Sequence, residues 1–124
     1  METTVETTTY PMIIGDQQAP SSSGKFINVI NPSTEEIIGR VSAATPEEVD
    51  QAVQIAQKAF KVWRDTPAAE RAAAMMKLVN AVRANIDDIA QILTKEQGKP
   101  LWQAKGEING FCAVIEYYAQ EARR

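Results

Sequence analysis

The sequence predicts a mostly α-helical chain with a short β-hairpin near its N-terminus. From Val49 to Ala122, apolar residues recur at steps of three and four, which places them on one face of a helix. Before Thr45, short apolar runs alternate with Gly, Asn-Pro and a Ser-rich stretch, as in strands joined by turns. The length of 124 residues fits one domain with a sizeable core.

The first part of the chain contains the expected strands. Residues 1–9, rich in Thr and Glu, are predicted to be a disordered tail, and the ordered segment is predicted to span 10–124. A hairpin is expected from Met12–Ile14, which ends at Gly15-Asp16, through a polar Ala-Pro-Ser-Ser-Ser-Gly loop to Phe26–Ile30. Asn-Pro then ends that strand, and Ile37–Val41 forms another.

The first helix has a clear start signal. In Thr45-Pro46-Glu47-Glu48, Thr45 can cap the helix, Pro46 suits the first turn and Glu48 can reach back to Thr45. The helix is expected to stop near Asp65. Its apolar face would comprise Val49, Ala52, Val53, Ala56, Ala59, Phe60 and Trp63.

A second helix is expected behind Thr66-Pro67, which repeats the cap-then-proline signal, with a break near Asn85. Gly98 suits the left-handed position after a helix, Lys99 complements the negative helix end, and Pro100 starts the next helix. The apolar face comprises Ala72, Met75, Met76, Val79, Val82, Ile86, Ile89, Ala90 and Leu93.

A last helix is expected to run to about Ala122. Gly106 and Gly110 lie four residues apart in it, which suggests a closely packed neighbouring element. Its apolar positions are Leu101, Ile108, Phe111, Cys112, Ile115, Tyr118, Ala119 and Ala122.

Composition excludes several kinds of site. The chain has no histidine and one cysteine, so a Cys–His dyad, a Ser–His–Asp triad and a Cys/His zinc site are impossible within it. The net charge of −3, with no basic cluster, argues against nucleic acid as a partner. No run of residues is apolar enough to span a membrane, and the N-terminus has no secretory signal pattern. We therefore expect a cytoplasmic protein.

Individual residues also have simpler interpretations than catalysis. Gly98-Lys99 lacks the first Gly and the Ser/Thr of a phosphate-binding loop. Cys112 lies among apolar residues on a predicted helix, where a buried, unreactive thiol is favoured. Glu96 and Glu107 are each more readily explained as solvated or ion-paired carboxylates than as acid–base groups.

Three stretches nevertheless carry a specific resemblance. They are "INPSTEEIIGRVSAATPEEVDQAVQIAQKAFKVWR", "PAAERAAAMMKLVNAVRANIDDIAQILTKEQGKPLWQAKGEI" and "EYYAQEARR". From about Phe26 to Arg124 the chain resembles the opening of an NAD(P)-dependent aldehyde dehydrogenase. The wording "EQGKPL…AKGEI" is similar to the branch that oxidises semialdehydes, of the succinate-semialdehyde type.

This resemblance implies that residues 10–124 are an incomplete N-terminal segment of the cofactor-binding domain of an α/β, Rossmann-like enzyme. In that family a thiolate attacks the aldehyde, hydride passes to NAD or NADP, and water activated by a glutamate releases the acid. The residues for these steps come later in the family's chains, so no catalytic or cofactor-binding residue is expected here, and the segment alone should be inactive. The implied partners are the remainder of the enzyme or homologous subunits in a homo-oligomer.

The resemblance also implies a structural monovalent cation, Na⁺ or K⁺. Its ligands in many members are a backbone carbonyl just before the Asn-Pro and an acidic side chain just before the Gly-Lys-Pro corner, which correspond here to Ile30 and Glu96. Alkali cations prefer oxygen ligands such as these. A third ligand is expected from beyond Arg124.

Two alternatives remain open from the sequence. The chain could be a stand-alone helical interaction module whose exposed helix faces form its functional surface. It could also be a truncated relic without catalytic activity.

Overall fold

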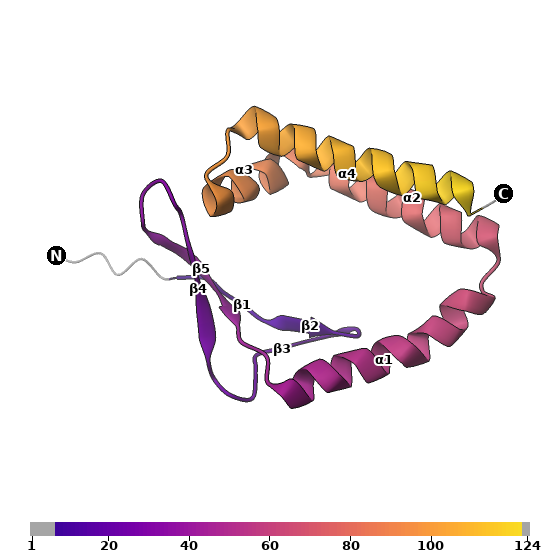
Figure 1. Cartoon of the computed structure of the whole chain (residues 1–124), viewed down its shortest axis with the longest axis horizontal. Helices are drawn as coiled ribbons and strands as arrows, with labels where there is room; N and C mark the ends of the chain where they lie inside the picture. Colours follow the sequence, from indigo (N-terminus) through magenta and orange to yellow (C-terminus); the bar gives the residue numbers. More distant parts are fainter. Residues whose placement is uncertain (1–6, 123–124) are drawn as a thin grey trace. The chain divides into compact units, whose positions relative to one another are not determined.

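The computed structural model describes residues 7–122, and the chain divides into two compact units at Lys61/Val62 (Figure 1). The first unit contains all the strands and most of α1, and the second contains α2, α3 and α4. The predicted fold class, mostly helical with a few short strands, is confirmed. The first six positions of the predicted tail at residues 1–9 lie outside the described residues, and Thr9 begins β1.

A three-stranded sheet in the first unit has the order β1-β5-β4. β4 and β5 are antiparallel, and β1 runs parallel to β5. The turn between β4 and β5 starts at the predicted Asn-Pro, where the Asn31 N–H donates to the Glu36 carbonyl at 2.9 Å. The strand bounds are β1 Thr9–Tyr10, β4 Phe26–Ile30 and β5 Ile37–Ser42.

The pairing of the expected hairpin was predicted wrongly. β2 (Met12–Ile14) does not pair with Phe26–Ile30 but with β3 (Gln17–Ala19), a strand that the sequence analysis missed. Gly15, with a φ of 66°, supplies the left-handed residue of the tight turn between them. Because β3 is polar and fully exposed, it has none of the apolar alternation that marks a strand in a sequence.

Helix α1 (Pro46–Asp65) begins with the predicted capping box. The Thr45 N–H donates to Glu48 Oε2 at 2.8 Å, and the Glu48 N–H donates to Thr45 Oγ1 at 3.3 Å. Its apolar residues have the predicted helical spacing, yet none of the residues of α1 is buried.

The break near Asn85 is confirmed, since α2 (Ala68–Ala84) ends there and α3 (Ile86–Gln97) begins after it. The sequence predicts that Thr66 and Asn85 cap the next helices with their side chains. Neither side chain makes such a capping hydrogen bond. The Thr66 hydroxyl donates back to the Val62 carbonyl at 2.8 Å, and the Asn85 amide donates to the Ala81 carbonyl at 2.8 Å. Both side chains therefore bond to the carbonyls of the preceding helix.

The Gly98 corner is as predicted. Gly98 has a φ of 73°, and its N–H donates to the Thr94 carbonyl at 2.8 Å, which closes α3. Pro100 precedes the first residue of α4 (Leu101–Glu121), where a residue without an N–H costs no helix hydrogen bond.

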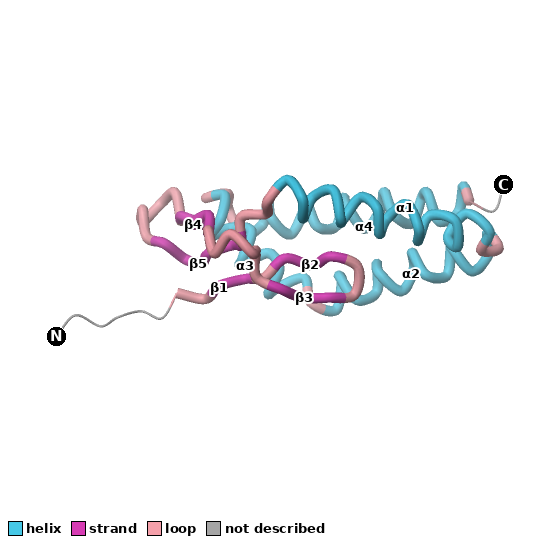
Figure 2. The backbone as a smooth tube through the Cα atoms, turned by 90° about the horizontal axis from the view of Figure 1, so that it is seen from below, coloured by secondary structure: helices cyan, strands magenta, loops and turns pink. Residues whose placement is uncertain are grey.

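The core of the second unit is built mainly from small side chains. α2 and α4 lie side by side along much of their length, and α3 packs on α4 (Figures 1 and 2). Small residues let the helix backbones approach closely, and Val79 and Cys112 are the largest side chains that are fully buried among them. The buried apolar residues are Ala72, Val79, Ala90, Ala104, Ile108, Cys112 and Ala119.

The close neighbour expected at Gly106 and Gly110 is not found. Among the described residues, no atom outside their own helix backbone and adjacent residues lies within 4 Å of a Cβ built at either glycine. Ala104 and Ile108 provide the close face of α4 instead, packed with Ala90 and bordered by Ile86 and Leu93.

A larger side chain at Ala104 should destabilise the helical unit. Ala104 is 0% exposed, so Ala104→Leu should lower the free energy of unfolding by about 1–3 kcal/mol through overpacking. Ala113→Leu on the exposed side of the same helix is the matched control and should change it little. Urea unfolding followed by the helical circular dichroism signal measures both. Equal effects of the two substitutions would contradict the packing described here.

Candidate functional site

The densest polar cluster in the described part of the chain surrounds the Glu48 carboxylate in the first turn of α1. Oε1 accepts the Ser22 N–H at 2.7 Å. Oε2 accepts the Thr45 N–H at 2.8 Å and the Ser21 hydroxyl at 2.9 Å. Ser21 is itself 94% buried, with 6% of its surface exposed. One carboxylate thus joins the serine loop before β4 to the start of α1.

These hydrogen bonds strongly favour the ionised form of Glu48. Donation from the backbone N–H groups of Ser22 and Thr45 lowers the pKa of Glu48 from its ordinary value of 4.5 to about 2. The position near the helix N-terminus also favours a negative charge. Glu48 is therefore ionised at neutral pH, and its negative charge holds the N–H groups of Ser22 and Thr45.

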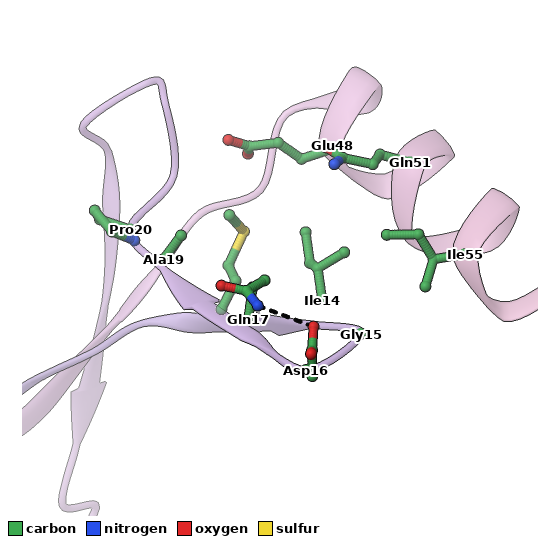
Figure 3. A pocket seen from close by; sticks show the side chains of 10 residues that line it. Ile14, Gly15, Asp16, Gln17, Ala19, Pro20, Glu48, Gln51 and Ile55 are labelled. Atoms are coloured by element: carbon green, nitrogen blue, oxygen red, sulfur yellow. Dashed lines mark hydrogen bonds between the residues drawn. The ribbon is translucent and has the colours of Figure 1, made fainter. Parts of the chain in front are cut away.

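A cavity of about 220 Å³ lies next to this cluster, between the β2–β3 hairpin and α1 (Figure 3). Ile14 points from the hairpin toward α1, and a Cβ built at Gly15 would lie 3.3 Å from Ile55. Asp16 and Gln17 at the hairpin tip hydrogen-bond to each other at 3.0 Å. The ionisable residues that line the cavity are the two acids Asp16 and Glu48, and the lining contains no serine, threonine, cysteine or lysine.

The Gly-Lys-Pro corner is held by an ion pair. Lys99 binds the carboxylate of Glu107 in the second turn of α4. Lys99 also follows the C-terminus of α3 directly, and its expected role in complementing the negative end of that helix stays a prediction. This pair also explains Glu107, one of the two carboxylates considered for acid–base chemistry, as an ion-paired residue.

A second pair connects α2 and α4. The Arg83 guanidinium donates to both oxygens of Glu116, at 2.6 and 2.8 Å. These hydrogen bonds lower the pKa of Glu116 and raise that of Arg83. Both side chains are partly exposed to solvent, so the pair fixes helix register more than it adds stability.

The predicted cation ligands lie in different units. Ile30 is the last residue of β4, and Glu96 lies exposed in the last turn of α3. The Glu96 carboxylate makes no hydrogen bond or ion pair with the side chain of any other described residue. The assignment of the two residues to one cation stays a prediction.

Cys112 is buried, as predicted, with 0% of its surface exposed. It packs in the helical core, where a thiol cannot reach a substrate. Among residues 7–122 there is also no group of three acidic or cysteine side chains that could hold a metal ion.

The sequence analysis missed the wider role of Glu48. The capping box identified its bond to Thr45, but Ser21 and Ser22 lie 27 and 26 residues earlier. In the sequence, the serines before β4 look like any polar loop. No repeating pattern of residues indicates that they lie near the start of α1. Glu116 and Arg83, 33 residues apart, escaped notice for the same reason.

Solved structures share this fold at high similarity. A succinate-semialdehyde dehydrogenase from Burkholderia pseudomallei matches with a TM-score of 0.87 and 40% identity, over 90% of this chain and 23% of that one. The lactaldehyde dehydrogenase of Escherichia coli matches with a TM-score of 0.91 and 30% identity, over 95% of this chain and 25% of that one. The fold is therefore that of a segment of an aldehyde-oxidising dehydrogenase.

Sequence comparison gives the same result. The aldehyde dehydrogenase family profile matches residues 19–124, and the chain belongs to that family. The glutarate-semialdehyde dehydrogenase of Pseudomonas putida is 40% identical over 111 residues, which cover 90% of this chain and 23% of that enzyme. The acylating, mitochondrial methylmalonate-semialdehyde dehydrogenase of Arabidopsis thaliana is 40% identical over 107 residues, 86% of this chain and 18% of that enzyme. The chain thus spans about a fifth of the length of these relatives.

The hydrogen bonds of Glu48 should make the stability of the chain depend on pH in the acid range. Because folding lowers the pKa of Glu48, its contribution is complete above pH 4.5 and is lost as the pH falls toward about 2. Glu48→Gln should therefore lower the thermal midpoint at pH 7 and reduce the loss of stability between pH 5 and pH 2.

The matched control is Glu47→Gln, since Glu47 is an exposed acid in the same helical turn. It should leave both the midpoint at pH 7 and the acid dependence close to those of the unaltered chain. Thermal melts at a series of pH values measure these effects. If the two variants had the same acid dependence, the role of the cluster would be refuted.

Proposed function

We propose that this chain supplies the N-terminal part of an enzyme that oxidises an aldehyde to a carboxylic acid with NAD or NADP. The observation that carries the proposal is the family match over residues 19–124, together with fold similarity to solved dehydrogenases along nine-tenths of the chain. In such an enzyme the segment described here has a supporting role. Its helices and strands position other parts, and its own polar clusters hold these elements together.

The proposed substrate class is an aldehyde that also carries a carboxylate. Relatives named for glutarate, methylmalonate, malonate and succinate semialdehydes are 35–40% identical to the chain. This support comes from relatives and not from a substrate pocket in the described residues, which offer no cationic group beside the one cavity discussed above.

The cofactor site is not assigned to this segment. A dinucleotide pyrophosphate needs a glycine-rich turn between a strand and a helix. Gly106 and Gly110 lie inside α4, and the glycines with positive φ occur at a hairpin tip, in the serine loop and at a helix end. We therefore propose that the residues that bind the dinucleotide lie in other parts of the enzyme.

The apolar face of α1 supports the proposed role as part of a larger assembly. Val49, Val53, Phe60 and Trp63 share one helical face and are 46–58% exposed. An apolar face of this extent normally packs against another element. We propose the remainder of the enzyme as its partner, within a cytoplasmic homo-oligomer. No described helix is long and apolar enough to cross a membrane.

The same face is what favours the alternative function, a stand-alone helical interaction module. In that case a separate protein would cover α1, and no dehydrogenase activity would accompany the chain. The size of the native polypeptide separates these two functions.

The intact mass of the native polypeptide, captured through an antibody to this segment, tests the proposal first. We expect a species several times heavier than 13.6 kDa that reduces NAD or NADP with succinate or glutarate semialdehyde. The purified 124-residue chain is the control and should form no NADH or NADPH with the same aldehydes. A native species of 13.6 kDa without activity would reject the proposal and favour the interaction module.

We also propose that the Ile30 carbonyl and the Glu96 carboxylate are ligands of a Na⁺ or K⁺ ion in the longer enzyme. The chemistry of the two donors fits an alkali cation, which binds oxygen ligands. Replacing tetramethylammonium by K⁺ or Na⁺ at equal ionic strength should raise the thermal midpoint, and Glu96→Gln should remove that rise. Glu70→Gln, an exposed acid on α2, is the control and should retain it. An unchanged response in Glu96→Gln would exclude Glu96 as a ligand.

A further inference from the structure

Asn109 and Gly110 form the only asparagine–glycine pair in the sequence. Both residues are exposed in α4, and the Asn109 side chain makes no hydrogen bond with any other described residue. The spacing of Gly106 and Gly110 predicts a packed neighbour, yet no described atom outside this stretch of α4 lies within 4 Å of a Cβ built at either glycine. Packing among the described residues therefore gives no reason for the two glycines.

An asparagine before a glycine is chemically labile, because the next backbone nitrogen can attack the side-chain amide. Attack by the Gly110 nitrogen on Asn109 Cγ forms a five-membered succinimide ring. The amide nitrogen of Asn109 leaves as ammonia and takes the proton of the Gly110 N–H with it. Water then opens the ring at either carbonyl and leaves aspartate or isoaspartate at position 109. Glycine hinders the attack least, since it has no Cβ and its backbone adopts most conformations.

The other four asparagines of the chain are less suited to this reaction. Two of them precede a β-branched residue, whose side chain hinders the attack. A third precedes proline, whose nitrogen carries no proton to release, and the fourth precedes alanine inside α2. These four residues are Asn28, Asn31, Asn80 and Asn85.

The α4 helix controls whether the reaction can occur at Asn109. In an α-helix each N–H bonds to the carbonyl four residues earlier, so the Gly110 N–H is directed to the carbonyl of Gly106. That geometry keeps the Gly110 nitrogen away from the Asn109 side chain. The attack therefore requires that this turn of α4 opens.

Two features lower the free energy needed to open this turn. Gly106 and Gly110 both belong to it, and glycine has a lower helix propensity than any residue except proline. The ion pairs of α4 also lie on either side, at Lys105 and Glu107 before the pair and at Glu116 after it. Among the described residues, no ion pair involves a residue between Glu107 and Glu116.

We propose that Asn109–Gly110 is a site of spontaneous deamidation whose rate is set by local opening of α4. The product carries a new negative charge two residues from Glu107. Isoaspartate also adds a carbon to the main chain, which interrupts the helix and displaces the buried residues Cys112 and Ala119. The modification thus accumulates in chains whose α4 has opened. It requires no dehydrogenase activity, and its failure would leave the proposed function unaffected.

Mass spectrometry of the 124-residue chain after incubation at mildly alkaline pH tests the site. The tryptic peptide that spans residues 106–123 contains Asn109 and no other asparagine. It should gain the small mass increase of an amide converted to an acid, in two products, one of which an isoaspartyl methyltransferase modifies. The peptides that contain the other four asparagines are internal controls and should stay unchanged. A sample digested before incubation corrects for deamidation during digestion.

Two glycine substitutions separate the reactivity of the pair from control by the helix. A Cβ meets no described atom at either position, so Gly106→Ala and Gly110→Ala should both fold. In the folded chain, Gly106→Ala should slow the reaction about fivefold, because the helix opens less often. In concentrated urea it should react as fast as the unaltered chain, since its asparagine–glycine pair is intact. Gly110→Ala should react more slowly under both conditions.

Several results would overturn the inference. One is a folded chain in which Asn109 is converted no faster than the other four asparagines. Another is a folded chain that shows no conversion at Asn109 while the sample in urea is fully converted. Equal rates for the folded Gly106→Ala variant and the folded unaltered chain would overturn the control by opening of α4.

Discussion

The first unit depends on the charge of one carboxylate. Glu48 accepts hydrogen bonds from Thr45, Ser21 and Ser22, so the helix start and the serine loop share a single acceptor group. From that loop, Ser23 donates to the Ala43 carbonyl at 3.3 Å and accepts the Lys25 N–H at 3.2 Å. The start of β4 is thus connected to α1 through a chain of polar contacts. Such a chain is needed because α1 buries no side chain of its own.

The second unit is held together differently. Its core consists largely of alanines, which contribute little apolar area each but allow the helices to lie close. Register between helices comes from ion pairs at their surfaces, with Arg83–Glu116 between α2 and α4 and Lys105–Asp87 between α3 and α4. The larger apolar side chains of α4, among them Phe111 and Tyr118, remain exposed. This distribution is that of a supporting segment in a larger protein, whose large side chains serve contacts beyond the three helices.

The sequence predicts the local structure well where one short-range rule decides it. The capping box at Thr45, the left-handed Gly98 and the helical spacing around Val79 each depend on residues within a turn or two of each other. Prediction fails where the deciding contact is distant or where polar residues form the element. Gln17–Ala19 is a strand only because Met12–Ile14 is beside it, and Thr66 and Asn85 bond backward because the preceding helix offers free carbonyls.

For the site, the sequence correctly indicated that Cys112 is buried, since its neighbours fix the helix face on which it lies. The partners of Lys99 and Glu48 were not predictable in the same way. Lys99 lies between two helices, and no short-range rule identifies Glu107, eight residues further along, as its ion-pair partner. Ser21 and Glu48 are brought together by the path of the intervening strands, which no local pattern specifies.

Helix α1 exposes an apolar face formed by Val49, Val53, Phe60 and Trp63. This face can bind a partner through the hydrophobic effect. Because that effect is not directional, any apolar surface of complementary shape can cover the face. That property fits the remainder of a longer chain, which is always present at high effective concentration.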